Sequence, residues 1–112
     1  MIKEDLQWSE FERVDMRVGT VVSAEVFAEV KKPAYKLLID FGPLGVLKTS
    51  TQITSSYQVD ELVGKQVIAV VNFPPKQIAN IQSECLVLGV VDGQDVTLLS
   101  IDKPVENGSK IA

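Results

Sequence analysis

Few side chains in this 112-residue sequence could do chemistry, because it contains no histidine and a single cysteine, Cys85. A Cys/His zinc cluster, a histidine general base or haem ligand, and a Cys–His nucleophile are therefore excluded. Cys85 lies in an apolar run, which favours a buried, inert thiol. The acidic pairs Asp60-Glu61 and Asp92-x-x-Asp95 offer too few ligands for calcium, and we expect turns there. We predict no catalytic residue, no metal and no cofactor, so the protein should act by binding.

The charge pattern limits what could be bound. The net charge is −4, from 11 basic and 15 acidic residues, which argues against uniform attraction of a polyanion. The charge is −3 over residues 1–15, +1 over 16–84 and −2 over 85–112, so only the central segment could carry a basic face. One cysteine agrees with a reducing cytoplasm. With no signal-peptide pattern and no run near the ~20 apolar residues of a membrane span, we expect a cytoplasmic protein without membrane insertion.

Strands should position most of the polar side chains. Ser9-x-x-Glu12 has capping-box spacing and predicts a short helix over about 9–14, with Trp8 and Phe11 as packing residues. The imperfect alternation of the first strand predicts a bulge or strong coil. Apolar patterning predicts three strands in this half of the chain, over 18–27, 35–41 and 46–49.

The second half continues with helical turns and further strands. Polar residues between Gln52 and Val63 predict one or two helical turns, which Gly64 stops. Phe73-Pro74-Pro75 must interrupt the sheet, because consecutive prolines lack ladder donors. Strands are predicted over 66–71, 85–91 and 96–99, with an Asp92-Gly93 hairpin turn and a last extended piece near 109–111.

This order of elements predicts an all-β fold. Three strands, a short helical connection, two more strands and C-terminal extension strands suit an OB-fold five-stranded barrel with a short N-terminal helix, and a small β-sandwich is the alternative. No repeat or linker divides the chain. We expect one domain over 1–112, with an N-terminal helical extension over 1–14 and a C-terminal extension over 96–112.

A family resemblance emerges from five segments that occur in order, over 15–21, 36–42, 48–53, 64–76 and 83–89. They begin Asp-Met-Arg-Val-Gly, Lys-Leu-Leu-Ile-Asp, Lys-Thr-Ser-Thr-Gln, Gly-Lys-Gln-Val-Ile and Ser-Glu-Cys-Leu-Val. From about Phe11 to Ile111, the chain resembles the tRNA-binding-domain branch of the OB fold and, within it, the CsaA family of export-related chaperones. Asn-Phe-Pro-Pro-Lys is also closer to CsaA than to synthetase-linked members.

The resemblance implies a cytoplasmic homodimer that binds unfolded or exported polypeptides without enzymatic activity. The alternative is a structure-selective tRNA-binding protein that uses the same surface. Synthetase-linked members more often have Ser-x-Gly-Met where this chain has Ser83-Glu84-Cys85-Leu86. Glu84 and Cys85 therefore weaken the case for tRNA as the main ligand.

The matched motifs also nominate binding residues. Lysine attracts phosphate, while hydroxyls and amides can bond phosphate, bases or a peptide backbone. Structural roles compete: the serines could cap turns, Asn72 could tie down the proline loop, and the lysines could be solvated residues beside strands. The polar candidates on or near the ligand-facing surface are Lys48, Ser50, Gln52, Asn72, Lys76 and Ser83.

Apolar candidates lie near the proline loop and the N-terminus. Pro75 and Ile78 are expected to contact a peptide, as part of a groove for apolar side chains. Phe73, Trp8 and Phe11 are instead candidates for the dimer interface. The well-matched segment around Gly19 is expected to be architectural, with a close approach or bend at the glycine and a pair of Asp15 with Arg17 that the spacing permits.

Overall fold

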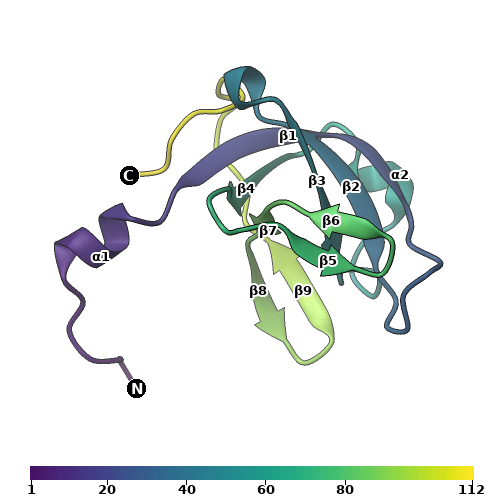
Figure 1. The fold of residues 1–112 in the computed structure, drawn as a ribbon, viewed down its shortest axis with the longest axis horizontal. Coiled ribbons are helices and arrows are strands. Elements are labelled where there is room, and N and C mark those ends of the chain that lie inside the picture. Colours follow the sequence, from purple (N-terminus) through teal and green to yellow (C-terminus); the bar gives the residue numbers. More distant parts are fainter.

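The computed structural model describes residues 1–112 and confirms an all-β, OB-like fold. Its main sheet has five antiparallel strands in the order β3-β2-β1-β4-β7. The sheet curls into a nearly closed barrel, around which β1 forms the long curved outer band (Figure 1). These strands are β1 (Met16–Val26), β2 (Tyr35–Asp40), β3 (Val46–Thr51), β4 (Gln66–Val70) and β7 (Leu86–Val87).

The length and curvature of β1 allow the sheet to close. Its first half pairs with β4 and its second half with β2, and the register with β2 shifts between Val21 and Ser23. This irregularity confirms the predicted bulge. The predicted close approach is found at Gly19, where a Cβ atom would lie 2.6 Å from Ile39 Cγ2 and 2.8 Å from the Phe41 ring.

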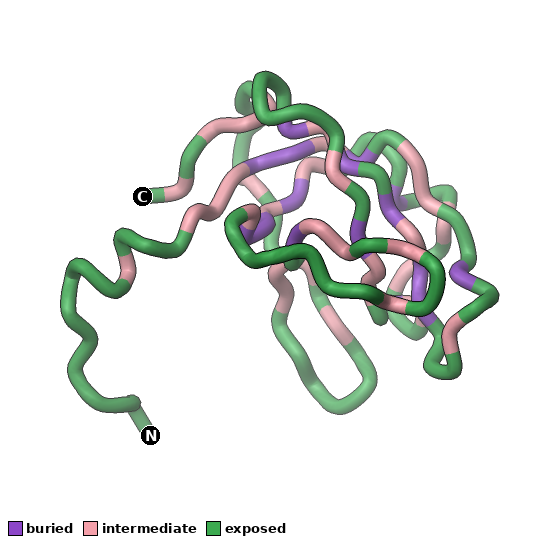
Figure 2. The backbone as a smooth tube through the Cα atoms, viewed as in Figure 1, coloured by how far each residue is buried: buried purple, intermediate pink, exposed green.

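The hydrophobic core fills the barrel: its strand residues come from β1, β2 and β4, and the partly buried Leu47 of β3 and Val87 of β7 pack against it. Helix α2 (Val59–Leu62) adds the buried Leu62, and Gly64 follows it with φ +93°, so the predicted helical turns and their stop are confirmed. Figure 2 shows burial concentrated along the main sheet, whereas the N-terminal segment and both hairpins are largely exposed. The core cluster consists of Val21, Tyr35, Leu37, Ile39, Phe41, Ile53, Leu62, Val67, Ala69 and Cys85.

Two hairpins lie outside the main sheet. One joins β5 (Lys76–Ile78) to β6 (Ile81–Ser83) through a turn at Ala79, whose φ is +48°. The other joins β8 (Gly89–Asp92) to β9 (Asp95–Leu98) through the predicted turn at Gly93. The single strand predicted over 85–91 is wrong, because β7 pairs with β4 and β8 pairs with β9. A short 3₁₀ helix, η1 (Gly42–Leu44), occupies the predicted turn before β3.

The N-terminal helix is shorter than predicted and is capped differently. Helix α1 spans Trp8–Glu12, not 9–14, and the backbone N–H of Gln7 donates to Glu10 Oε1 at 2.9 Å. The predicted capping box of Ser9 and Glu12 is therefore wrong, because the helix is capped two residues earlier, by Gln7 and Glu10. The Trp8 and Phe11 rings lie 5.8 Å apart, but no residue of α1 is buried and Trp8 is 71% exposed, so neither ring packs in the core of this chain.

The C-terminal segment runs beside the start of β1. Val18 N–H donates to Ser109 O at 2.9 Å, and Ile111 N–H donates to Met16 O at 2.9 Å, which confirms the last extended piece. Asp15 and Arg17 form an ion pair at 2.6 Å, and Arg17 also donates to the Gly108 carbonyl. None of the helices is long and apolar enough to span a membrane.

Candidate functional site

The barrel has a seam where the edge strands β3 and β7 meet. At one end of the seam Glu84 N–H donates to Lys48 O at 2.8 Å, and Lys48 N–H donates to Glu84 Oε1 at 2.9 Å. The buried Thr49 hydroxyl donates to Cys85 O at 2.7 Å and lies 3.0 Å from Ser83 Oγ. Side chains and one main-chain bond therefore hold this end together, without a regular strand ladder.

Beyond these bonds the seam opens into a groove of about 770 Å³. One wall comes from the end of β3 and the chain after it, residues 50–55. The other comes from β7 and the β8–β9 hairpin, and Lys32 and Pro33 add the loop between β1 and β2. The second wall consists of residues 86–89 together with Val91, Gly93, Gln94 and Val96. We call this cavity the seam groove.

The seam groove differs in charge from the rest of the molecule. Lys32 is its only charged lining residue, and it contains no carboxylate although the chain has 15 acidic residues. Hydroxyl and amide groups gather on the β3 side, while the opposite wall is mainly aliphatic. Such a lining can form hydrogen bonds and apolar contacts with an uncharged ligand, and it offers little to a polyanion.

The structure brings several predicted binding residues together at this seam. Ser50 and Gln52 line the groove, and Ser50 N–H donates to Ser83 Oγ at 3.3 Å. Ser83 pairs in turn with Lys76 across the β5–β6 hairpin. Lys48 is exposed on β3, two residues before Ser50 and on the same face of the strand. Lysine, serine and amide groups thus form one band from β3 to β5.

The remaining predicted residues lie outside that band. Pro75 is exposed immediately before β5, and Ile78 is half-buried next to the turn of the β5–β6 hairpin. Asn72 accepts a hydrogen bond from Asp15 N–H at 3.0 Å and donates to Arg13 O at 2.7 Å. Its amide therefore ties the end of β4 to the entry of β1, the structural role that its sequence position allowed.

The apolar candidates for an interface are on the surface of this chain. Phe73 is 56% exposed in the loop after β4, and Trp8 and Phe11 lie on α1, which projects away from the barrel (Figure 1). None of these aromatic rings is buried in the core of the single chain. They stay predicted dimer contacts.

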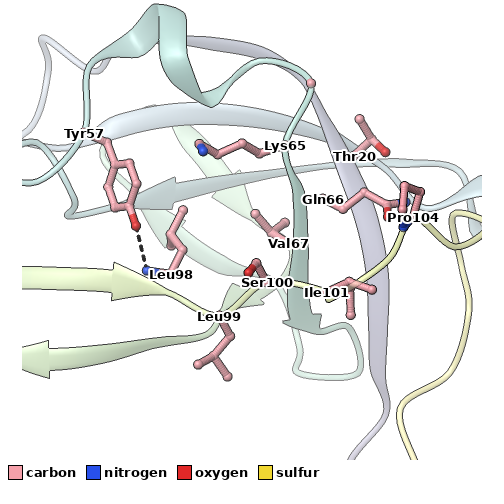
Figure 3. A pocket seen from close by; sticks show the side chains of 11 residues that line it. Thr20, Tyr57, Lys65, Gln66, Val67, Leu98, Leu99, Ser100, Ile101 and Pro104 are labelled. Carbon is pink, nitrogen blue, oxygen red and sulfur yellow. Dashed lines mark hydrogen bonds between the residues drawn. The ribbon is translucent and has the colours of Figure 1, made fainter.

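A second cavity, of about 550 Å³, lies between the start of β4 and residues 98–104 (Figure 3). Thr20, Tyr57 and Gln66 already have side-chain partners within the chain, which leaves Lys65 and Ser100 as its unpaired polar side chains. Tyr57 OH accepts from Leu98 N–H at 2.9 Å, and Gln66 exchanges hydrogen bonds with the backbone of Val105 at 2.7 and 3.1 Å. This cavity is where the C-terminal extension attaches to the barrel, and it presents few free groups to a ligand.

Cys85 is buried beside the seam, as its apolar surroundings predicted. The pKa of its thiol is raised from 9.0 to about 12, mainly by burial; a hydrogen bond with Thr49 partly opposes this rise, and the Glu84 charge adds a smaller one. The thiol stays protonated at neutral pH, so it is a weak nucleophile.

Sequence reasoning missed the residues that close the seam and most of those that line its groove. Thr49 and Glu84 make the closing hydrogen bonds, and Lys32, Thr54 and Val91 belong to the groove. The only sequence signal was the uncharged polar run from Thr49 to Ser56, interrupted by Ile53. The opposite wall is far away in the sequence, since Thr49 and the Cys85 that it contacts are 36 positions apart, and no periodicity links the two segments.

Comparison with known proteins agrees with this architecture. A family model described as "Putative tRNA binding domain" matches residues 16–110. A solved structure of the chaperone CsaA from Bacillus anthracis str. Ames is 46% identical, with a TM-score of 0.94 over 97% of this chain and 100% of that one. The chain belongs to the tRNA-binding-domain family, in its CsaA branch. The resemblance drawn from the sequence is confirmed.

Two further relatives show the breadth of that family. A CsaA chaperone protein from Picrophilus torridus is 49% identical, with a TM-score of 0.90 over 96% of this chain and 100% of that one. A methionine–tRNA ligase of Methanocaldococcus jannaschii is 36% identical over 96% of this chain, but the chain spans only 16% of that enzyme's length. The CsaA branch thus matches over whole chains, and the ligase over one part of a larger protein.

Proposed function

We propose that this protein is a non-enzymatic chaperone of the cytoplasm, a homodimer that binds unfolded or exported polypeptides. The observation that carries the proposal is the seam groove, which has one cation and no carboxylate in a chain of net charge −4. An unfolded polypeptide presents an uncharged backbone and apolar side chains. Hydroxyls and amides on one wall and aliphatic side chains on the other suit both features.

The similarity to CsaA chaperones over whole chains supports the same function. The groove contains no carboxylate, histidine or cysteine, the chain has no group of three metal-ligating side chains, and its one thiol has a raised pKa. A protein of this kind would delay aggregation by holding segments of its clients, without ATP.

The test is a combined aggregation and binding assay. The purified protein should delay light scattering by a thermally unfolded preprotein and should bind an uncharged, apolar peptide in a fluorescence titration. Because main-chain and apolar contacts depend little on ionic strength, peptide affinity should change less than about twofold between low and physiological salt. The proposal fails if the protein neither delays aggregation nor binds peptides.

A matched pair of variants locates the binding. Gln52→Glu introduces a carboxylate into the groove, whereas Asn80→Asp makes the same charge change on the exposed turn of the β5–β6 hairpin. Desolvation of the new charge should weaken uncharged-peptide binding by about fivefold or more in Gln52→Glu. Asn80→Asp should leave affinity unchanged; equal losses in both variants would place the binding elsewhere.

tRNA binding is the second candidate, and the matched family description and the ligase relatives favour it. Its cations would be Lys48 and Lys76, which flank the band of serines beside the groove. So few phosphate contacts predict weak affinity that falls steeply with salt. A gel shift with tRNA across a salt series decides the matter: binding that survives physiological salt and is lost in Lys48→Ala or Lys76→Ala would place tRNA above polypeptide.

A further inference from the structure

One wall of the seam groove is an open strand edge, and its first part is β7. Leu88 N–H donates to Ile68 O at 2.9 Å, and Leu86 pairs with Val70, so both bond toward β4. Val87 lies between them, opposite Ala69. Antiparallel bonding alternates along a strand, so the Val87 N–H and C=O point away from β4.

The edge continues along β8. On the partner strand β9, Val96 N–H donates to Ser56 Oγ at 3.1 Å, and Leu98 N–H donates to Tyr57 OH at 2.9 Å. These two residues therefore face away from β8. Their cross-strand partners, Val91 and Gly89, must likewise face away from β9.

The three outward-facing residues all line the groove, together with Leu86 and Leu88, whose backbones bond toward β4. Val87, Gly89 and Val91 line the groove, whereas Val90 and Asp92, which bond to β9, do not. Two residues before Val87 the same edge is occupied, because the Cys85 carbonyl accepts a hydrogen bond from the Thr49 hydroxyl. The open edge is thus a continuation of the barrel seam, at the point where β3 diverges from β7.

The edge strand itself carries no lysine, proline or charged side chain between Val87 and Val91. Natural edges are blocked by lysine, proline, inward-pointing charges or a covering segment. Lys48 and the Ser83–Glu84 side chains protect β3 in this way. The edge from Val87 to Val91 has only aliphatic residues and glycine, and Val91 is 72% exposed.

From this geometry we infer that an extended polypeptide segment binds the protein as an added β-strand along Val87, Gly89 and Val91. This inference rests on the proposed chaperone function and specifies how the client is recognised. Main-chain hydrogen bonds supply affinity for many sequences, and the groove accepts alternate side chains. A segment matching residues 87–91 needs about five residues, or roughly 17 Å of strand.

The lining of the two groove walls determines which client side chains can be accommodated. Every second side chain would enter a groove without carboxylates, so these positions suit apolar or small polar residues. The intervening side chains face away from the groove, and their identity matters little. Proline is excluded at positions whose N–H meets the edge, because it lacks that donor.

Backbone-modified peptides test this mode on the unmodified protein. The probes are three nine-residue peptides of one alternating apolar–polar sequence: unmodified, N-methylated at two apolar positions, and N-methylated at two neighbouring polar positions. The alternation fixes which face enters the groove, so a one-residue register slip cannot rescue binding. One methylated peptide should bind about tenfold or more weakly than the unmodified peptide, and the other within about threefold.

A protein variant provides the second arm. Val91→Pro removes an N–H that faces the groove and makes no bond to β9, whereas Val91→Ala trims the side chain and keeps the N–H. Peptide affinity should fall about tenfold in Val91→Pro and less than about threefold in Val91→Ala. Amide chemical shifts of β9 monitor whether the hairpin stays folded in Val91→Pro.

The outcomes separate the two proposals. Equal binding of all three peptides, or equal affinities of the two Val91 variants with the hairpin intact, overturns strand addition and leaves chaperone function standing. If the unmodified peptide does not bind at all, both proposals fall. If Val91→Pro loses the β8–β9 hairpin, the methylated peptides alone decide, since they use the native protein.

Discussion

Single hydroxyl and amide groups hold the ends of this barrel together. Thr49 is a buried polar residue whose hydroxyl bridges Cys85 O and Ser83 Oγ, so it replaces the ladder that β3 and β7 do not form. Asn72 has the same role at the opposite side, between β4 and β1. Buried or bridging polar groups of this kind stabilise only while each partner is present.

Asn72 is expected to contribute to stability through its two hydrogen bonds. Asn72→Ala removes the acceptor for Asp15 N–H and the donor to Arg13 O, and should lower the free energy of unfolding by about 1–3 kcal/mol. Urea denaturation measures the change. Asn80→Ala, in the exposed turn of the β5–β6 hairpin, is the matched control and should change stability by less than about 0.5 kcal/mol. Equal stability of the two variants would contradict the bracing role.

Cys85 should be unreactive in the folded protein. Its pKa is raised from 9.0 to about 12, so the thiolate fraction at pH 8 falls by roughly a thousandfold. Alkylation by iodoacetamide should accordingly be slower by about that factor in native protein than in protein unfolded by guanidinium, before exclusion of the reagent is counted. Rapid modification of the native protein would contradict burial of the thiol.

The same pKa shift affects stability at high pH. The unfolded thiol ionises near pH 9.0, while the folded thiol stays neutral to about pH 12, so ionisation favours the unfolded state. The contribution of the neutral thiol is therefore full below pH 9 and is lost as the pH rises toward 12. Urea denaturation at pH 8 and pH 11 should show a larger loss in the wild type than in Cys85→Ala.

At the scale of elements, the strands that could be predicted are those whose pairing agrees with their apolar pattern. Tyr35–Asp40 alternates buried and less buried residues, and the apolar run of β4 was recognisable in the same way. Periodicity fails where a strand changes partner. The run from Cys85 to Val91 looks continuous, yet Val87 is in register with Ala69 of β4, while Val91 is in register with Val96 of β9.

Short elements were missed for a related reason. The β5–β6 hairpin has three residues in each strand. Its turn contains Ala79 in place of the glycine that normally marks a tight turn. At the N-terminus, Gln7–Glu10 has the same spacing as Ser9–Glu12, but glutamine is not a usual N-cap residue, so the sequence favoured Ser9 and only the structure shows Gln7 in that position. The seam groove could not be predicted at all, because its walls come from separate segments that meet only when the barrel closes.

The C-terminal extension should be an essential part of the sheet. Its main-chain bonds to Val18 and Met16 measure 2.7–2.9 Å and cover the edge of β1 that β2 leaves open. Deletion of residues 108–112 should lower the free energy of unfolding by about 2–4 kcal/mol, on three lost hydrogen bonds and an exposed edge. Calorimetry measures the effect. Deletion of Ala112 alone, which is exposed and makes none of these bonds, should leave the melting temperature nearly unchanged.

The whole molecule has more exposed apolar surface at its N-terminus than one chain explains. Ile2, Leu6 and Trp8 are each more than 60% exposed, and α1 has five residues and no buried side chain. A helix of this length is unstable in water without tertiary contacts. Something outside the single chain should therefore cover α1 and Phe73, and a second copy is the occupant that the proposed function requires.

Sedimentation equilibrium tests that assembly. The wild type, at micromolar concentration, should have twice the mass of the 12.3 kDa chain. Trp8→Ala combined with Phe73→Ala removes the two exposed aromatic rings and should weaken dimerisation by about a hundredfold or more, since large buried aromatic residues dominate interface energies. Val91→Ala truncates an equally exposed apolar residue on the seam groove and should stay dimeric. A monomeric wild type would exclude the homodimer, whereas a dimer unaffected by the double substitution would place the interface on another face. Dimerisation through α1 and Phe73 would leave a seam groove open on each subunit, so one assembly could hold two segments of the same client.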